Sequence, residues 1–284
     1  MTTILVTTAL ITLGAFVILW LISVGIKDAS IADPFWGASF VLVTWVAFAQ
    51  AADPGPRQAL VVILVTIWGT RLAVYLTARN RGHGEDYRYQ AMRRRWGRQF
   101  PLVSLATVFA LQATLVWVVS LPVLVTMLES SDLGLVGLAG TILWIIGLIF
   151  EATGDWQLAR FKKDPTNAGI VLDRGLWRYT RHPNYFGDFC AWWGIFLVAV
   201  VDVSMLWTVA GPIVMSTLLL RVSGVALLED SIRKRRPGYE DYMWRTSAFF
   251  PWKPRELPSL DQDGTIRGTD DMESRRQDSD ERVE

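Results

Sequence analysis

The stretch RHPNYFGD at residues 181–188 gathers side chains that can bind or react with a polar ligand. Arginine and histidine can donate hydrogen bonds to an anion, asparagine and aspartate can bind an amide or a ribose hydroxyl, and tyrosine can stack on a ring. An uncharged run follows at 189–201. These polar side chains therefore lie immediately before an apolar segment. The alternative is that the stretch is only a polar connector. Its polar members are Arg181, His182, Asn184, Tyr185 and Asp188.

The segment before this stretch adds both acidic and basic groups. Glu151 and Asp155 are four residues apart, so a helix would place them on one face, either as a solvated helix end or as part of a site. The basic residues that follow can anchor lipid headgroups or hold a phosphate. The further candidates in this segment are Arg160, Lys162, Lys163, Arg178 and Tyr179.

Glu229 lies where the last apolar run ends, and Arg233 follows it one helical turn later. At this spacing the two can form a structural ion pair, or they can complete a cofactor pocket. Pro237 and Gly238 then predict a break between two short pieces.

The N-terminal half holds a second group of candidates. Arg71 lies inside an apolar run, where an ionised group is costly and marks a functional site by default. Tyr75 is one turn further on the same face. Asp33 stands before Pro34 at the start of another run, as a helix cap or as a proton donor. Tyr87 follows in the next polar loop.

Seven apolar runs must position these groups. Most are long enough to cross a hydrocarbon core of about 30 Å, whereas 189–201 is short. The first run is not a signal peptide, because it lacks a basic start and a small-residue cleavage site. We expect an all-α integral membrane protein with about seven transmembrane helices. The runs are 4–26, 35–52, 60–78, 102–128, 133–150, 189–201 and 203–220.

Positive charge is distributed unevenly between the loops. The loop 79–101 carries seven arginines and 151–188 carries six basic residues. The positive-inside rule predicts that both loops and the C-terminal end are cytoplasmic and that the N-terminus lies outside, in a bacterial inner membrane. Residues 1–252 then form one membrane domain, and 253–284 form an acidic, disordered tail.

The rare residue types exclude several classes of site. One cysteine and two histidines exclude a disulfide, an iron–sulfur cluster and a zinc centre, so we expect no metal. The chain has neither a glycine-rich dinucleotide fingerprint nor a P-loop, so we expect no Rossmann domain. The expected partners are membrane lipids and a hydrophobic small molecule, with no nucleic acid, and we expect a monomer.

Several stretches resemble a known family. GLWRYTRHPNYFGD followed by WWG, and YEDYMWRTSAFFPW near the end, resemble the steroid 5-alpha-reductase C-terminal-like superfamily. KDASIADPFWG and WGTRLAVYLTARNRGHGEDYRY resemble its bacterial branch, the DUF1295 family, so the resemblance covers most of 20–252. Sterol C14-reductases and isoprenylcysteine carboxyl methyltransferases have a similar RHPxY element.

The resemblance implies seven helices, a lipidic substrate held by 1–128 and NADPH held by cytoplasmic loops of 129–252. It also departs from the steroid reductases, which polarise a ketone with a tyrosine and a glutamate. Trp68 stands at the tyrosine position, and the glutamate falls near 33–36, so Trp36 and Trp68 are substrate-contact candidates. Arg71 and Tyr75 match family positions. The matching cofactor positions are Asp155, Lys162, Lys163, Asn184, Asp188, Glu229 and Arg233.

These features predict an NADPH-dependent reductase of an activated carbon–carbon double bond in a steroid or sterol-like 3-oxo-4-ene. Tyr75, Asp33 and Tyr87 are the candidate acids, with Arg71 as electrostatic support. The alternative is an S-adenosylmethionine-dependent methyltransferase of a lipidic substrate. A third possibility is a non-enzymatic membrane scaffold or small transporter.

Overall fold

The computed structural model describes residues 1–128, 130–222, 229, 232–233 and 236–256. The chain divides into two compact units. Unit 1 contains Met1–Thr153 and Asn184–Leu227, and unit 2 contains Gly154–Pro183 and Leu228–Glu284. The predicted acidic tail falls, from 257 onward, outside the described residues.

The regular structure of the described residues is helical, apart from one isolated bridge between Thr180 and Ser247. This confirms the all-α prediction. The α-helices are α1 (Thr2–Ile26), α2 (Ala32–Phe48), α3 (Pro56–Asn80), α4 (Tyr87–Trp96), α5 (Phe100–Ser104), α6 (Leu111–Val119), α7 (Leu121–Thr126), α8 (Gly134–Lys163), α9 (Pro183–Ala199), α10 (Ala210–Thr217) and α12 (Tyr239–Arg245).

Six helical segments in the described residues are long and apolar enough to cross a membrane, so the chain is a multi-pass membrane protein. About seven were expected from the sequence, and the seventh apolar run lies in a helix just below this length. The segment predicted at 189–201 forms α9, whose 17 residues span about 26 Å at 1.5 Å per residue. The six are Thr2–Ile26, Ala29–Phe48, Pro56–Asn80, Tyr87–Val119, Gly134–Lys163 and Val203–Arg221.

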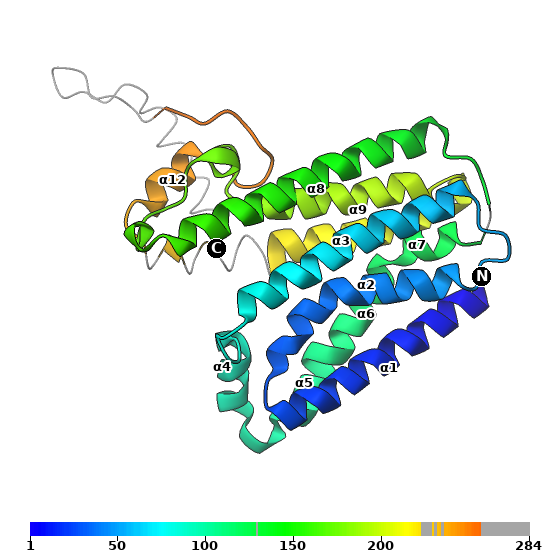
Figure 1. The fold of residues 1–284 in the computed structure, drawn as a ribbon, viewed down its shortest axis with the longest axis horizontal. Helices are drawn as coiled ribbons and strands as arrows, with labels where there is room; N and C mark the ends of the chain where they lie inside the picture. The colour runs from blue at the N-terminus through cyan, green and yellow to red at the C-terminus, as the bar shows by residue number, and fades with distance from the viewer. Residues whose placement is uncertain (129, 223–228, 230–231, 234–235, 257–284) are drawn as a thin grey trace, which may run out of the picture. The chain divides into compact units, whose positions relative to one another are not determined.

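Glycines let the helices of unit 1 approach closely. In Figure 1, α8 and α9 lie side by side, and their backbones meet at Gly140 with Gly194 and at Gly147 with Gly187. A Cβ atom on Gly194 would lie 2.6 Å from the Gly140 carbonyl oxygen. Small residues commonly allow such contacts between membrane helices, because apolar side chains gain little by leaving lipid.

Replacing Gly194 by alanine is expected to lower the free energy of unfolding by about 1–3 kcal/mol, because the added methyl group must push two backbones apart. Unfolding in mixed detergent micelles measures this. Gly14→Ala in α1 is the matched control, since nothing lies within 4 Å of a Cβ there. If Gly194→Ala lost no more stability than Gly14→Ala, this would contradict the close packing of α8 and α9.

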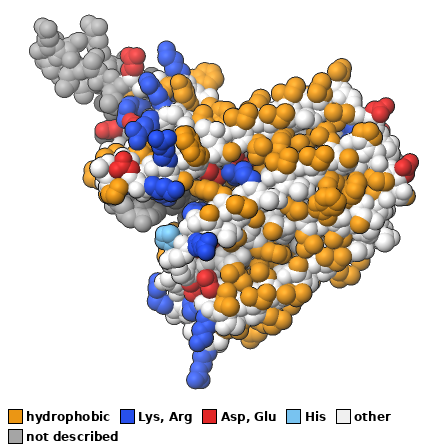
Figure 2. All heavy atoms as spheres, viewed as in Figure 1, with side chains coloured by type: hydrophobic (Ala, Val, Ile, Leu, Met, Phe, Trp, Pro, Cys, Tyr) orange, Lys and Arg blue, Asp and Glu red, His pale blue; other side chains and the backbone are white. Residues whose placement is uncertain are grey.

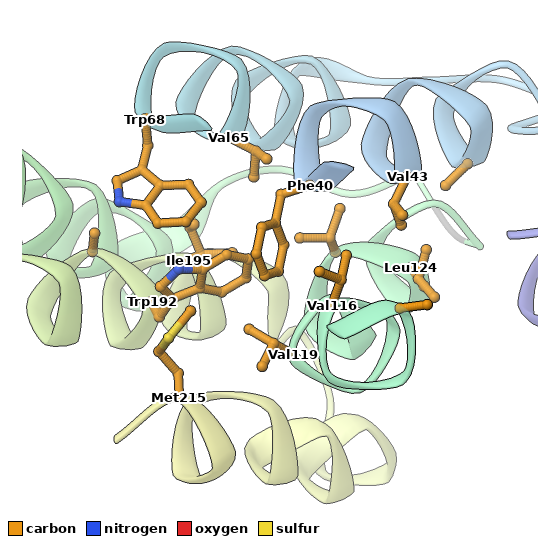
Figure 3. Close-up of a cluster of buried hydrophobic side chains, with 14 of the residues drawn as sticks. Phe40, Val43, Val65, Trp68, Val116, Val119, Leu124, Trp192, Ile195 and Met215 are labelled. Carbon is orange, nitrogen blue, oxygen red and sulfur yellow. The ribbon is translucent and has the colours of Figure 1, made fainter. Parts of the chain in front are cut away.

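Aromatic side chains fill the centre of unit 1 (Figure 3). Phe40 of α2 lies with its ring centroid 4.6 Å from Trp192 of α9 and 5.4 Å from Trp68 of α3. The two indoles meet edge to face at 5.2 Å. All three side chains are fully buried, so Trp68 is a core residue in this structure. Trp36, the other substrate-contact candidate, packs against Phe40 from the edge of this cluster.

The outer surface of unit 1 is apolar. Figure 2 shows hydrophobic side chains spread over the visible face of its helices. On α1, Leu10, Ile18 and Leu21 are more than half exposed. Such a surface is unfavourable in water and suits contact with lipid chains.

Unit 2 is built from the C-terminal end of α8, a short 3₁₀ turn at Gly175–Arg178 and α12. The backbone N–H of Arg181 donates to Ser247 O at 2.9 Å, and that of Trp252 donates to Tyr179 O at 3.0 Å. Gly238, with φ 78°, stands immediately before α12. This confirms the predicted break at Pro237 and Gly238.

Candidate functional site

The first polar group of unit 1 is an ion pair between α3 and α8. Arg71 Nη2 donates to Glu151 Oε1. Glu151 is only 3% exposed, and the Arg71 side chain is 19% exposed. The predicted possibility of a solvated helix end is therefore wrong for Glu151. Asp155, which belongs to unit 2, is 4% exposed, so it is not solvated either.

The surroundings of this pair fix its geometry. The Arg71 guanidinium carbon lies 5.9 Å from the centroid of the Tyr75 ring, one turn further along α3. Gly187 of α9 packs on the Glu151 backbone, where a Cβ atom would come within 2.4 Å of the nitrogen. The backbone at Glu151 thus packs closely against α9, and its side chain pairs with Arg71 of α3. The structure brings together Arg71 and Tyr75, as predicted, and adds Glu151.

A second polar group of unit 1 surrounds Asp33. Tyr89 Oη donates to Asp33 Oδ1 at 2.7 Å, and Arg88 Nη2 donates to Oδ2 at 2.6 Å. Asp33 does not cap α2, because it lies in the first turn of that helix; Asp28 caps the preceding turn instead. Both oxygens of Asp33 are engaged, so its role here is to anchor α4.

Tyr89 is the buried tyrosine of this group, and Tyr87 is not. Tyr87 is 69% exposed, whereas Tyr89 is 6% exposed. The helical period places positions two apart on different faces, so one of the two had to point outward. The spacing of Tyr87 and Tyr89 could have raised this alternative from the sequence alone.

Tyr89→Phe is expected to lower the free energy of unfolding by about 1.5–3 kcal/mol, because the change removes the hydrogen bond from a buried hydroxyl to the partly buried, charged carboxylate of Asp33. Chemical denaturation of the purified protein measures this loss. Tyr87→Phe removes the same atom from an exposed position and should change stability little. Equal effects of the two substitutions would argue against the Tyr89–Asp33 bond.

Hydrogen bonds attach the turn before α4 to the 3₁₀ turn that precedes α2. Glu85 accepts hydrogen bonds from Arg93 and from the backbone N–H of Ala29, and the backbone N–H of Asp86 donates to Ser30 Oγ. Burial opposes ionisation of Glu85, but these bonds outweigh it and hold the pKa of its carboxyl below the ordinary value.

Unit 2 holds the RHP element in a buried network. Arg181 donates from Nε and Nη2 to the two oxygens of Glu229, at 2.8 and 3.1 Å, and from Nη1 to the Met243 carbonyl at 2.7 Å. His182 Nε2 lies 2.9 Å from Glu229 Oε1, and the residue is 2% exposed. Arg233 donates to Glu240 at 2.8 Å. Glu229 therefore pairs with Arg181, and not with Arg233, the partner that the spacing in the sequence suggested.

Two tyrosines of α12 complete this network. Burial, and then the charge of Glu229, raise the pKa of Tyr239 to about 12. Tyr242 Oη donates to the Trp177 carbonyl at 2.6 Å. These contacts tie α12 to the RHP element, so Arg181, His182 and Glu229 position the backbone of unit 2.

The remaining cofactor candidates fall into two sets. Asn184, Tyr185 and Asp188 belong to unit 1 and are partly buried at the start of α9. The others belong to unit 2, where most of the basic side chains are exposed and Tyr179 is 46% exposed. The exposed basic candidates are Arg160, Lys162, Lys163, Arg178 and Arg233.

The chain matches the family described as "Protein of unknown function (DUF1295)" over residues 19–246, and it belongs to that family. It is also similar to an uncharacterized protein of Schizosaccharomyces pombe, with 24% identity over 266 residues that cover 82% of this chain and 76% of the yeast protein. No solved structure matches the chain.

Proposed function

We propose that this protein is a membrane-embedded, NADPH-dependent reductase of an activated carbon–carbon double bond in a hydrophobic substrate. The substrate class is a 3-oxo-4-ene steroid or a sterol-like lipid. The observation that carries the proposal is the Arg71–Glu151 ion pair beside Tyr75, on helices apolar enough to cross the membrane. Ionic groups at such positions are costly and usually serve binding or catalysis.

Each member of this group has a distinct task. The Arg71 guanidinium stabilises the negative charge that develops on the substrate carbonyl oxygen, which is worth a few kcal/mol when the donor is held in place. The Tyr75 hydroxyl donates a proton to the carbon next to the substrate carbonyl, which completes the saturation of the double bond, and Glu151 orients the guanidinium. Tyr75 and Arg71 are the catalytic residues of the proposal, and Glu151 is a positioning residue.

The residues of unit 2 fit part of a dinucleotide. Exposed lysines and arginines suit its phosphates, and the carboxylate of Asp155, 4% exposed, suits a hydroxyl or an amide. Lys162 and Lys163 would hold a 2′-phosphate, and Asp155 a ribose or carboxamide group. NADPH supplies the hydride when it is bound. Arg181, His182 and Glu229 hold the surrounding backbone, since they are engaged with one another.

The proposed location is a bacterial inner membrane. The arginine-rich loop after α3 would face the cytoplasm, which puts the N-terminus outside, three crossings away. The basic segment after α8 would then also be cytoplasmic. The C-terminal end shares this side only if α9 crosses the bilayer as well. The protein would act as a monomer.

Ligand-dependent thermal unfolding tests the cofactor. Full-length protein in detergent is heated with NADPH, NADH or S-adenosylmethionine. We expect NADPH to stabilise the protein by about 2.7 kcal/mol at a hundred times its dissociation constant, with a smaller effect of NADH. Stabilisation by S-adenosylmethionine alone would support the methyltransferase, and no response to any of the three would support a scaffold.

Lys162→Gln/Lys163→Gln should abolish the preference for NADPH over NADH, because it removes the charges proposed to hold the 2′-phosphate. The matched control is Arg275→Gln/Arg276→Gln, which makes the same charge change in the acidic C-terminal segment. An unchanged preference in the lysine variant would remove these residues from the proposed site.

A further inference from the structure

The arginines of α4 and its flanks in unit 1 differ in what they contact. Arg93 binds Glu85 with Nε and Nη2, at 3.0 and 2.7 Å. Arg88 binds Asp33 and Asp86. These two arginines fix α4 on the first turn of α2 and on the turn before it, and both are engaged by carboxylates.

Three further arginines have no such use. Arg94, Arg95 and Arg98 are exposed, and within the described part of the chain they form no ion pair. Arg95 lies over the ring of its neighbour Trp96, with 5.6 Å between guanidinium carbon and centroid. Three exposed arginines within residues 94–98 attract an anionic partner.

The surroundings of these arginines indicate the class of that partner. Tyr87, seven residues before Arg94 and thus on the same helical face, is 69% exposed, and Trp96 is 40% exposed. Exposed tyrosine and tryptophan are typical of the membrane–water interface. Leu102, 71% exposed, follows within the same membrane-spanning segment, Tyr87–Val119. The positive surface therefore lies at the polar end of an apolar span.

We propose that Arg94, Arg95 and Arg98 form a binding surface for the headgroups of anionic phospholipids, with Tyr87 and Trp96 seated between those headgroups. The guanidinium groups donate to phosphate oxygens. The ion pairs of Arg88 and Arg93 already hold α4 in place. Binding of the lipid therefore does not require α4 to become ordered. This surface does not depend on the proposed reductase activity.

Native mass spectrometry of the full-length protein, with phosphatidylglycerol and phosphatidylcholine at equal concentrations, tests the proposal. The wild-type protein should bind phosphatidylglycerol preferentially. Each arginine near an anionic surface contributes about fivefold in affinity. Arg94→Gln/Arg95→Gln/Arg98→Gln should therefore lose most of the preference, and the corresponding triple lysine variant should keep it.

Two controls separate this surface from net charge and from misfolding. Arg275→Gln/Arg276→Gln/Arg282→Gln removes the same charge from the C-terminal segment and should leave the lipid preference intact. The melting temperature of the Arg94/Arg95/Arg98 glutamine variant should match the wild type, because all three arginines are exposed.

The proposal is overturned if the wild-type protein shows no preference, or if the triple glutamine variant keeps it. It is also overturned if a preference appears only after Asp270, Asp271 and Glu273 are neutralised. That result would mean that the acidic C-terminal segment, and not lipid, occupies the arginine surface.

Discussion

Glu229→Gln is expected to lower the free energy of unfolding of unit 2 by about 3–5 kcal/mol. Glu229 receives two hydrogen bonds from Arg181 and lies 2.9 Å from His182, and the side chains of the acid and the arginine are about nine-tenths buried. Glutamine keeps one accepting oxygen but removes the negative charge, so the Arg181 charge stays buried without a counter-ion. Breaking one side of a buried pair costs this much because the remaining charge is uncompensated.

Limited proteolysis of unit 2 at increasing temperature measures this loss. Glu240→Gln is the matched control, since it breaks the pair with Arg233 at the surface, where the two side chains are 70% and 60% exposed. Exposed pairs contribute little. If the two glutamine variants were cleaved at the same temperature, the network around Glu229 would not hold unit 2 together.

Glu151→Gln is the second large effect that we expect. The change leaves the Arg71 guanidinium without its carboxylate between membrane-spanning helices, and should cost about 3 kcal/mol of stability. Arg71→Gln should have a similar effect. The double variant should lose less than the sum of the two, because the second change removes the uncompensated charge.

A double-mutant cycle in mixed micelles measures that coupling. Arg79→Gln is the control for arginine removal from α3, because Arg79 is exposed and its side chain donates to the neighbouring Asn80. Additive losses at Arg71 and Glu151 would show that the ion pair contributes nothing to stability. They would also weaken the role of Glu151 as the group that orients Arg71.

The helices could be predicted from the sequence because the bilayer sets their length and composition. Six of the expected runs lie in helices long enough to cross a membrane, and the seventh forms α9, which is short because its uncharged run is short. The position of Gly187 against Glu151 was not predictable in this way. It depends on which face of α9 meets α8, and apolar residues surround both helices.

The candidate site was predictable only where one residue signals function by itself. Arg71 did so, because an arginine within an apolar run needs a partner. That its partner is Glu151, 80 positions later, or that Arg181 pairs with Glu229, 48 positions later, follows from tertiary packing and not from local spacing. Local spacing suggested Arg233 as the partner of Glu229, and this was wrong.

Transfer of deuterium from NADPH tests the central proposal most directly. Protein in liposomes is incubated with a bacterial membrane lipid extract and a 3-oxo-4-ene steroid, with NADPH deuterated at the reactive carbon and S-adenosylmethionine carrying a labelled methyl group. We predict that one lipid or steroid gains one deuterium and one proton, and that Arg71→Gln and Tyr75→Phe abolish this gain. A labelled methyl group in the product, with no deuterium transferred, would contradict the account.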